Sequence, residues 1–477
     1  MNFISHRLSL VIITAGILLL FLFMRLYRLP QTLEFYSDIG RDHYMLLLWQ
    51  QSGKPPLLGP STSFLPLNQS PWYFYLMYPV FLILGLSPYT SIITLLLFYC
   101  FVYLLGVYVY RNNPIALRMI WIIFTVISIH SLFVEQNRYP WNPSFVTPFL
   151  LISLFALFFN EGGVKRRIVA FTAGTVFALG MSYSIVPTAL VLTVAGLIHF
   201  KRNWLLLCGS LVFSGCIVFL PILVSEMKHG FFSFHRLFSE RGGQFSFRQD
   251  LWLKMKEMFL FVFWGRAGDV RQLLWPLAIL TITCLSLKLK KIRSDRDRIY
   301  AKLLLLLIAT VLLTLISPFV LYSHYVYGVL TLLICLIATF PKRLLFLFIL
   351  SCLPFWFSKD SMNSTLLRPI RRSVSDLETC AVLVCASEKE PMYIVDAAWH
   401  DYHFAPDHLF FFNRAGCNAK DITSNPGFAN RMAVVIDQGS FTFGKSSFNE
   451  LTLFGEATPS ATYQCPSRIT VEVLKSL

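Results

Sequence analysis

A short polar stretch after the first apolar run carries the residues best suited to chemistry. The stretch FYSDIGRDHYMLLLWQQSGKPPLLGPSTS holds Asp38, Arg41, Asp42 and His43 close together. A carboxylate partly buried at a membrane surface can accept the proton of an attacking hydroxyl group, because burial shifts its pKa toward the range useful for a base. Asp38 is therefore our candidate general base.

The same stretch has a plainer structural interpretation. Tyr44, Leu47 and Leu48 recur at helical spacing, and Gly53 followed by two prolines ends the pattern. This predicts a short helix on the membrane surface, which Asp38 or the serine before it would cap. A cap and a base are compatible roles, so both stay open.

Long apolar runs surround this stretch. The 477 residues are 56% hydrophobic and 14% charged, with a mean hydropathy of +0.61, whereas soluble proteins carry about 25% charged residues. Runs of about 16–22 apolar residues predict a polytopic α-helical membrane protein with about eleven crossings. The predicted spans are 8–24, 89–110, 115–133, 145–159, 168–183, 185–200, 204–224, 272–287, 301–318, 324–340 and 344–357. Segment 72–86 is short and is predicted to be re-entrant or juxtamembrane.

Charge predicts the orientation in the membrane. The net charge is +16, which anionic lipids and cytoplasmic loops explain better than nucleic acid, because the basic residues are dispersed among the loops. If segment 72–86 does not cross, most basic clusters fall on one side, with Arg25 and Arg28 as exceptions. This places the amino terminus in the cytoplasm and the carboxyl terminus outside a cell membrane.

The tail differs from the rest of the chain. Residues 358–477 read as a small extracytoplasmic α/β domain, in which MYIVDAAW and RMAVVIDQG are buried strands. Four cysteines lie in this tail, at positions 380, 385, 417 and 465, and their spacing does not suit zinc. Two disulfides are expected outside the cell, with all three pairings open.

The first part of the chain resembles a known family. The stretch quoted above, then NQSPWYFYLMYPVFLILGLSP and NRYPWNPS, look like the GT-C glycosyltransferases that use lipid phosphosugars. The protein-mannosyltransferase-like members are similar, and the aminoarabinose transferase is related to them. The resemblance implies a transmembrane GT-C domain over residues 1–357, with a catalytic first external loop at 25–88. It also implies that Asp38 matches the catalytic aspartate of that loop.

The resemblance implies a reaction as well. A polyprenyl-phosphate sugar is the donor, a hydroxyl on a glycan, glycolipid or protein is the acceptor, and no cofactor is required. A divalent metal stays open, because no ligand set is visible. The donor phosphate needs cations, and an acceptor or second-loop site is expected where relatives often carry an acid. Our candidates for the donor are Arg41, Lys54, Arg138, Arg241, His324 and Tyr325, and for the acceptor or second-loop site Asp42 and Asn142.

Several of these residues have structural alternatives. Arg138 could pair with Glu135, Arg241 could lie in an exposed turn, and His324 with Tyr325 could be ordinary interfacial aromatics. Two other functions also remain: a polysaccharide polymerase or ligase with a lipid-diphosphate donor, and a transporter or flippase for lipid-linked sugars. Against a transporter, the charges gather outside the predicted spans.

Overall fold

A computed structural model describes residues 2–62 except 34 and 36, 67–233, 235, 251–264, 295–317, 321, 323–341, 345–346, 366, 372–397, 405–436, 441 and 448–477. The chain divides into two compact units. Unit 1 comprises Met1–Tyr27, Pro56–Leu76 and Ile92–Met362. Unit 2 comprises Arg28–Pro55, Met77–Ser91 and Asn363–Leu477, so it includes much of the first loop, which the sequence assigned to the membrane domain.

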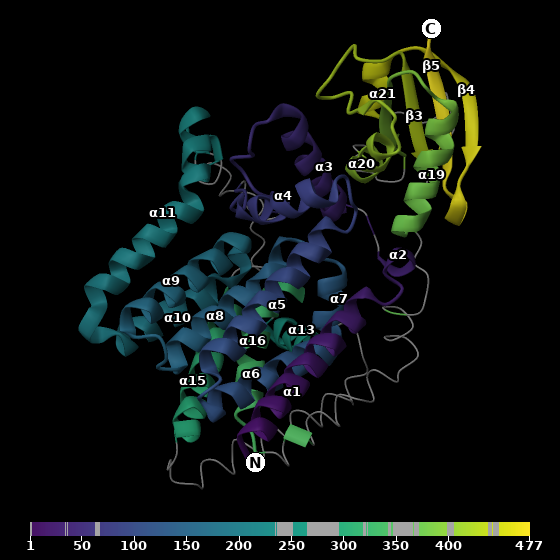
Figure 1. Cartoon of the computed structure of the whole chain (residues 1–477). Coiled ribbons are helices and arrows are strands. Elements are labelled where there is room, and N and C mark those ends of the chain that lie inside the picture. Colours follow the sequence, from purple (N-terminus) through teal and green to yellow (C-terminus); the bar gives the residue numbers. More distant parts are fainter. Residues whose placement is uncertain are drawn as a thin grey trace. The chain divides into compact units, whose positions relative to one another are not determined.

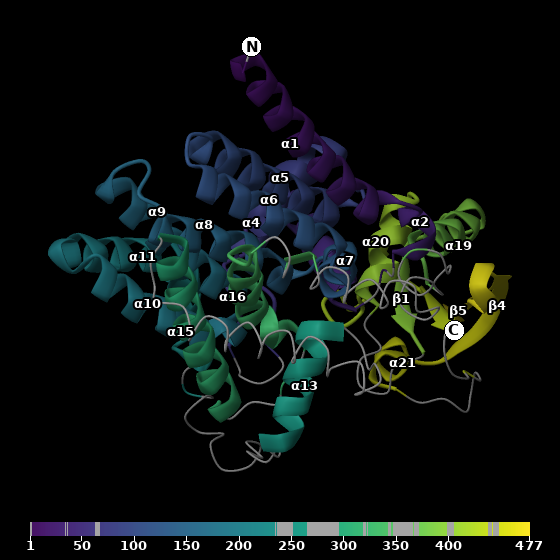
Figure 2. The ribbon, with the colours of Figure 1, turned by 90° about the horizontal axis from the view of Figure 1, so that it is seen from below.

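Apart from one isolated bridge between Ser61 and Asn68, the regular secondary structure in the described part of unit 1 is helical (Figure 1). Helix α8 packs against α9, α9 against α11, and α15 against α16 (Figure 2). Its helices are α1 Asn2–Leu26, α5 Thr90–Tyr110, α6 Pro114–Ile129, α7 Ser131–Arg138, α8 Val146–Phe158, α9 Val164–Met181, α10 Val186–His199, α11 Trp204–Lys228, α13 Leu251–Trp264, α15 Asp295–Ile316 and α16 Tyr327–Ala338, with 3₁₀ turns η1 Asn142–Phe145, η2 Tyr183–Ile185, η3 Lys201–Asn203 and η6 Ser323–Val326. Helix α5 begins in unit 2, and α4 Trp72–Leu84 is shared between the units.

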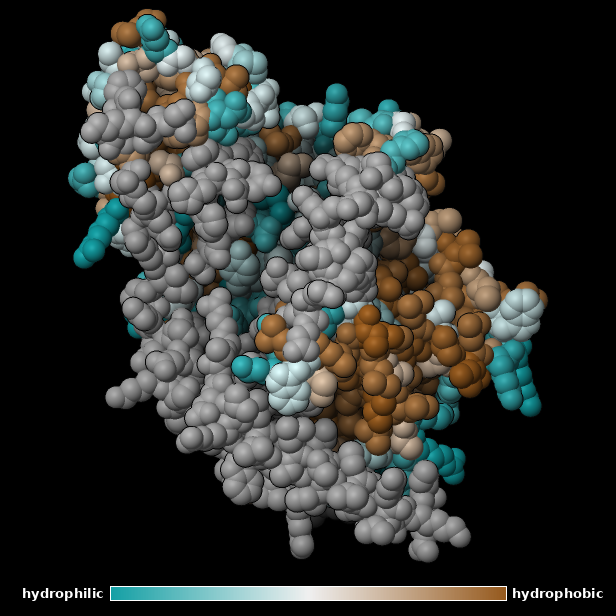
Figure 3. Space-filling model, turned by 180° about the vertical axis from the view of Figure 1, so that it is seen from behind, coloured by the Kyte–Doolittle hydropathy of each residue, from teal (hydrophilic) through white to brown (hydrophobic). Residues whose placement is uncertain are grey.

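These helices confirm the predicted membrane character at a coarser level than a count of eleven crossings. Within the described residues, four helices are long and apolar enough to span a bilayer, and the bent pair formed by α6 and α7 adds a fifth. The predicted spans 272–287 and 344–357 lie outside the described residues. Figure 3 shows a broad apolar surface over unit 1. Exposed side chains such as Leu190, Ile198 and Phe213 face outward, as expected of helices that contact lipid.

A buried arginine explains part of the exception in the charge pattern. Arg25, at the end of α1, is fully buried and donates to the carbonyl oxygens of Ser128 and Ile127 at 3.0 and 2.6 Å. Its guanidinium also lies 4.1 Å from the ring centre of Phe21. Arg25 is therefore part of the packing between α1 and α6, and does not act as a loop charge.

Unit 2 is built around a five-stranded sheet of order β2-β1-β3-β5-β4 (Figure 1). Its strands are β1 Met392–Asp396, β2 Ala419–Lys420, β3 Arg431–Ile436, β4 Ala457–Gln464 and β5 Thr470–Ser476, and its helices are α2 Leu29–Thr32, α3 Ser37–Ser52, α19 Val374–Ser387, α20 Pro406–Arg414 and α21 Asn449–Phe454, with the 3₁₀ turn η8 Pro466–Arg468. Strand β1 runs parallel to β2 and β3, and β5 runs antiparallel to β3 and β4. All five residues of β1 are buried, which is typical of a parallel strand covered on both faces. The two predicted strands are thus confirmed as β1 and β3.

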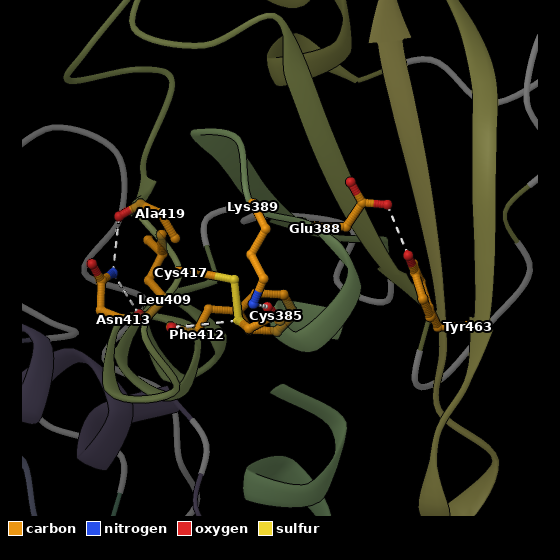
Figure 4. The surroundings of a disulfide bond; sticks show 9 residues. All are labelled: Cys385, Glu388, Lys389, Leu409, Phe412, Asn413, Cys417, Ala419 and Tyr463. Carbon is orange, nitrogen blue, oxygen red and sulfur yellow. Dashed lines mark hydrogen bonds between the residues drawn. A yellow bond between two sulfur atoms is a disulfide. The ribbon is translucent and has the colours of Figure 1, made fainter. Parts of the chain in front are cut away.

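The four cysteines of the tail form two disulfides. Cys380 pairs with Cys465, and Cys385 pairs with Cys417. Figure 4 shows the second bond joining the end of α19 to the segment that follows α20. The expectation of two disulfides is confirmed, and the structure selects one of the three pairings.

Candidate functional site

The first turn of α3 brings three of the predicted site residues together. Nη1 of Arg41 lies 2.7 Å from Oδ1 of Asp38, and Nη2 and Nε of Arg41 donate to Oδ1 of Asp42 at 2.8 and 2.9 Å. The Asp38 side chain is 31% exposed, whereas that of Asp42 is fully buried. The guanidinium therefore ties an accessible carboxylate to a buried one.

The local sequence explains this geometry. The predicted helix is confirmed as α3, with Ile39, His43, Leu46 and Leu47 on its buried face, at spacings of four, seven and eight residues. Leu48, which the pattern placed on that face, is exposed. Because Asp38 and Arg41 are three residues apart, their side chains lie next to each other on the helix.

His43 points away from these charged groups and into the interior. Its ring packs against Phe35 and Phe410, and its Nδ1 lies 2.9 Å from the carbonyl oxygen of Ile39. Burial lowers the pKa of His43 to about 4 and outweighs the hydrogen bond to Ile39, which raises it. At neutral pH the ring is uncharged, so it acts here as a core residue.

Lys54 lies at the other end of α3. The helix rises about 1.5 Å per residue, so Lys54 is roughly 20 Å along the axis from Asp38. The structure does not bring these two residues together. The backbone N–H of Lys54 donates to Oγ of Ser52 at 3.2 Å, and the Lys54 side chain is exposed.

Arg138, in unit 1, is buried against backbone carbonyl groups. Its guanidinium is buried and donates to the carbonyl oxygens of Arg25 and Tyr27, each at 3.0 Å, and of Met24 at 3.3 Å. These contacts join the end of α7 to the end of α1. They favour a structural role over phosphate binding.

The other predicted residues of unit 1 that the structure describes lie on turns between helices. Nδ2 of Asn142 donates to the carbonyl oxygen of Met181 at 2.6 Å. The ring of His324 contacts Trp141 at 4.9 Å and Tyr325 at 4.4 Å between ring centres. The structure thus brings His324 and Tyr325 close to the residue that precedes Asn142.

Arg241 lies outside the described residues. Among the residues that the structure does describe, no three His, Cys, Asp or Glu side chains are grouped to hold a metal ion.

Sequence reasoning missed a buried charged cluster in unit 2. Arg372 forms ion pairs with Asp407 and, at 3.5 Å, with Asp396, and its Nη2 lies 3.3 Å from Nε2 of His408. Burial alone would raise the pKa of Asp407, but the charges of His408 and Arg372 lower it below its usual range. Two signals in the sequence could have indicated this cluster. Asp396 ends a buried strand, and Asp407 with His408 lies in the first turn of a helix.

Comparison with solved structures gives the fold of the whole chain. ArnT from Cupriavidus metallidurans bound to undecaprenyl phosphate superposes with a TM-score of 0.60 over 97% of each chain, at 11% sequence identity. The chain has the fold of ArnT. ArnT from the same organism in the apo state gives a TM-score of 0.60 over 98% of each chain, at 13% identity. The resemblance to GT-C enzymes is therefore confirmed at the level of fold.

No protein-family model and no curated protein matches the sequence.

Proposed function

We propose that this chain is an integral-membrane inverting glycosyltransferase that uses a polyprenyl-phosphate sugar and has Asp38 as its general base. The observation that carries the proposal is the accessible Asp38 carboxylate held by Arg41 in the first turn of α3, in a chain with the fold of ArnT. A related solved structure holds undecaprenyl phosphate, which supports a lipid-linked donor.

The proposed step is a displacement at the anomeric carbon. The acceptor hydroxyl oxygen forms a bond to that carbon, and the bond between the carbon and the phosphate oxygen breaks. Asp38 takes the hydroxyl proton, and polyprenyl phosphate leaves with the bonding electrons. The leaving group is already activated as a phosphate ester, so the step needs no nucleotide.

Arg41 has a narrower role in this proposal than the sequence implied. Its contacts with Asp38 and Asp42 suit it to orient the base. For the donor phosphate and sugar we retain Lys54, Arg241, His324 and Tyr325, and for the acceptor Asn142. Arg138 is not retained, because carbonyl oxygens already accept from its guanidinium.

We also propose that unit 2 lies outside the cytoplasm of a cell membrane. Disulfides persist in oxidising compartments, and unit 2 contains two. The charge pattern of the loops supports the same orientation. A lipid-borne donor then reaches Asp38 from the outer leaflet.

The test is Asp38→Asn in the detergent-solubilised full chain. The probes are radiolabelled undecaprenyl-phosphate sugars, including aminoarabinose, mannose and glucose, with an envelope extract as the acceptor. We expect a loss of about 10²–10⁴-fold in transfer, because a positioned base contributes that much. Asp376→Asn is the matched control, since Asp376 also lies in the first turn of a helix of unit 2.

Unchanged transfer by Asp38→Asn would refute the role of Asp38. Transfer from undecaprenyl-diphosphate sugars alone would replace the donor class with that of a polymerase or ligase. Movement of labelled lipid across vesicles without any transfer would support a flippase instead.

A further inference from the structure

We infer that Arg372, although far from Asp38 in the sequence, is a positioning residue that fixes the location of the Asp38 side chain. Its catalytic consequence rests on the proposed function, whereas the role of Arg372 in holding α3 does not depend on that function. All the contacts that support it lie within unit 2.

Arg372 meets the chain just before α3 through its backbone. The N–H of Phe35 donates to the carbonyl oxygen of Arg372 at 3.4 Å, and the N–H of Val374 donates to that of Leu33 at 3.3 Å. Arg372 has a φ of 62°, a left-handed conformation that side chains with a Cβ rarely adopt. Such a conformation persists where the surrounding contacts enforce it.

The side chain of Arg372 contacts α20, and its backbone contacts the segment that precedes α3. Its guanidinium pairs with Asp407, in the first turn of α20, and with Asp396, the last residue of β1. All three side chains are at most 5% exposed. Removing one partner of an ion pair buried to this degree is strongly destabilising, because it leaves an uncompensated buried charge. Arg372 thus joins the sheet and α20 into one rigid support.

Helix α3 rests directly on this support. A Cβ placed on Gly40 would lie 2.5 Å from Cβ and 2.7 Å from Cα of Asp407, so only glycine permits this approach. The ring of Phe35 packs against Phe410 and Phe411, with centres 5.6 and 4.8 Å apart. Asp38 lies between these two contacts in the sequence. The position of its carboxylate therefore follows the position of α20.

Two variants test this support at two different contacts. Arg372→Ala removes the charged junction, and Gly40→Ala removes no charged group but places a Cβ against Asp407 and so pushes α3 and α20 apart. Arg431→Ala is the control for the first, because Arg431 pairs with Glu388 and Glu390 in the same unit. Gly215→Ala is the control for the second, because a Cβ there meets no atom within 4 Å.

The first measurement is hydrogen–deuterium exchange of the full-length chain in detergent, and it requires no substrate. We expect the peptide that covers residues 35–45 to exchange at least about tenfold faster in both variants, since local opening sets the rate. In both controls this peptide should exchange as in the wild type. Unchanged exchange in Gly40→Ala overturns the inference, even if Arg372→Ala fails to fold.

The second measurement separates positioning from general loss of structure. With an undecaprenyl-phosphate sugar that the wild type uses, both variants should show a kcat about 100-fold lower, the effect of a displacement of about 1 Å, with the donor KM within about twofold. Faster exchange with a normal kcat overturns the positioning role. If the wild type transfers no sugar, the proposed function fails, while the exchange result still decides whether Arg372 holds α3.

Discussion

At the scale of single residues, neighbouring side chains at the start of α3 differ in exposure. Asp38 and Arg41 stay partly accessible, while Asp42 and His43 are fully buried. Helical periodicity places Asp38, Arg41 and Asp42 next to one another on the helix surface, so the difference in exposure comes from what packs against each side chain. The turn therefore presents one carboxylate outward and anchors it through Arg41 to another inside.

The burial of His43 predicts a dependence of stability on pH. Its pKa is about 4 in the folded chain and 6.5 in an unfolded one. Between these values the unfolded state binds a proton that the folded state does not, so stability is lost as the pH falls from 6.5 toward 4. We expect His43→Phe to remove about 2 kcal/mol of this loss between pH 6.5 and 4.5.

Thermal unfolding in detergent at the two pH values measures this difference. The exposed His229, changed to Phe, is the control and should leave the pH dependence as in the wild type. An equal loss of stability in wild type and His43→Phe would show that other groups cause it.

Sequence reasoning was most successful for residues whose surroundings are local. The helix over Ser37–Ser52 and the strands β1 and β3 follow from periodicity and turn residues. The roles of Arg138 and Gly40 do not, because their partners are more than a hundred residues away and no local pattern records them. The pairing of the four cysteines also stayed open, because no local pattern records partners that are 85 and 32 residues apart.

At the scale of elements, two disulfides brace the helix α19. Cys380–Cys465 ties it to the turn before β5, with a separation of 85 residues, and Cys385–Cys417 ties it to the segment after α20, with a separation of 32. Figure 4 shows this second bond beside the contacts of Phe412 and Asn413. The longer loop restricts the unfolded chain more.

We therefore expect unequal costs when the two bonds are removed separately. Replacing Cys380 and Cys465 together by Ser should destabilise unit 2 by about 4–5 kcal/mol, and replacing Cys385 and Cys417 by about 3–4 kcal/mol. Differential scanning fluorimetry, with and without reductant, measures the order. A larger loss from the Cys385–Cys417 pair would show that native contacts, and not loop length, dominate.

At the scale of the whole molecule, apolar helices and a disulfide-bonded α/β unit share one chain. The apolar surface of unit 1 suits lipid, and the bonds of unit 2 suit an oxidising compartment. The burial of Arg25 removes one of the two exceptions in the charge pattern. The predicted orientation is consistent with both units.

This orientation predicts the activity of fusion proteins. Alkaline phosphatase, which requires disulfides, should be active when fused after Leu477 and inactive when fused after Arg202, in a bacterial inner membrane. Green fluorescent protein at the same two positions should give the reverse pattern. Active phosphatase at Arg202 would contradict the orientation.

The division of unit 2 into distant pieces of chain bears on how the protein is made. Residues 28–55 leave the ribosome roughly 300 residues before Arg372, a delay of roughly 15–60 s at about 5–20 residues per second. During that time the apolar face of α3 has no α20 to cover it, although the first membrane helix is already synthesised. Until α20 is synthesised, the apolar face of α3 must be covered by the bilayer surface or by a chaperone.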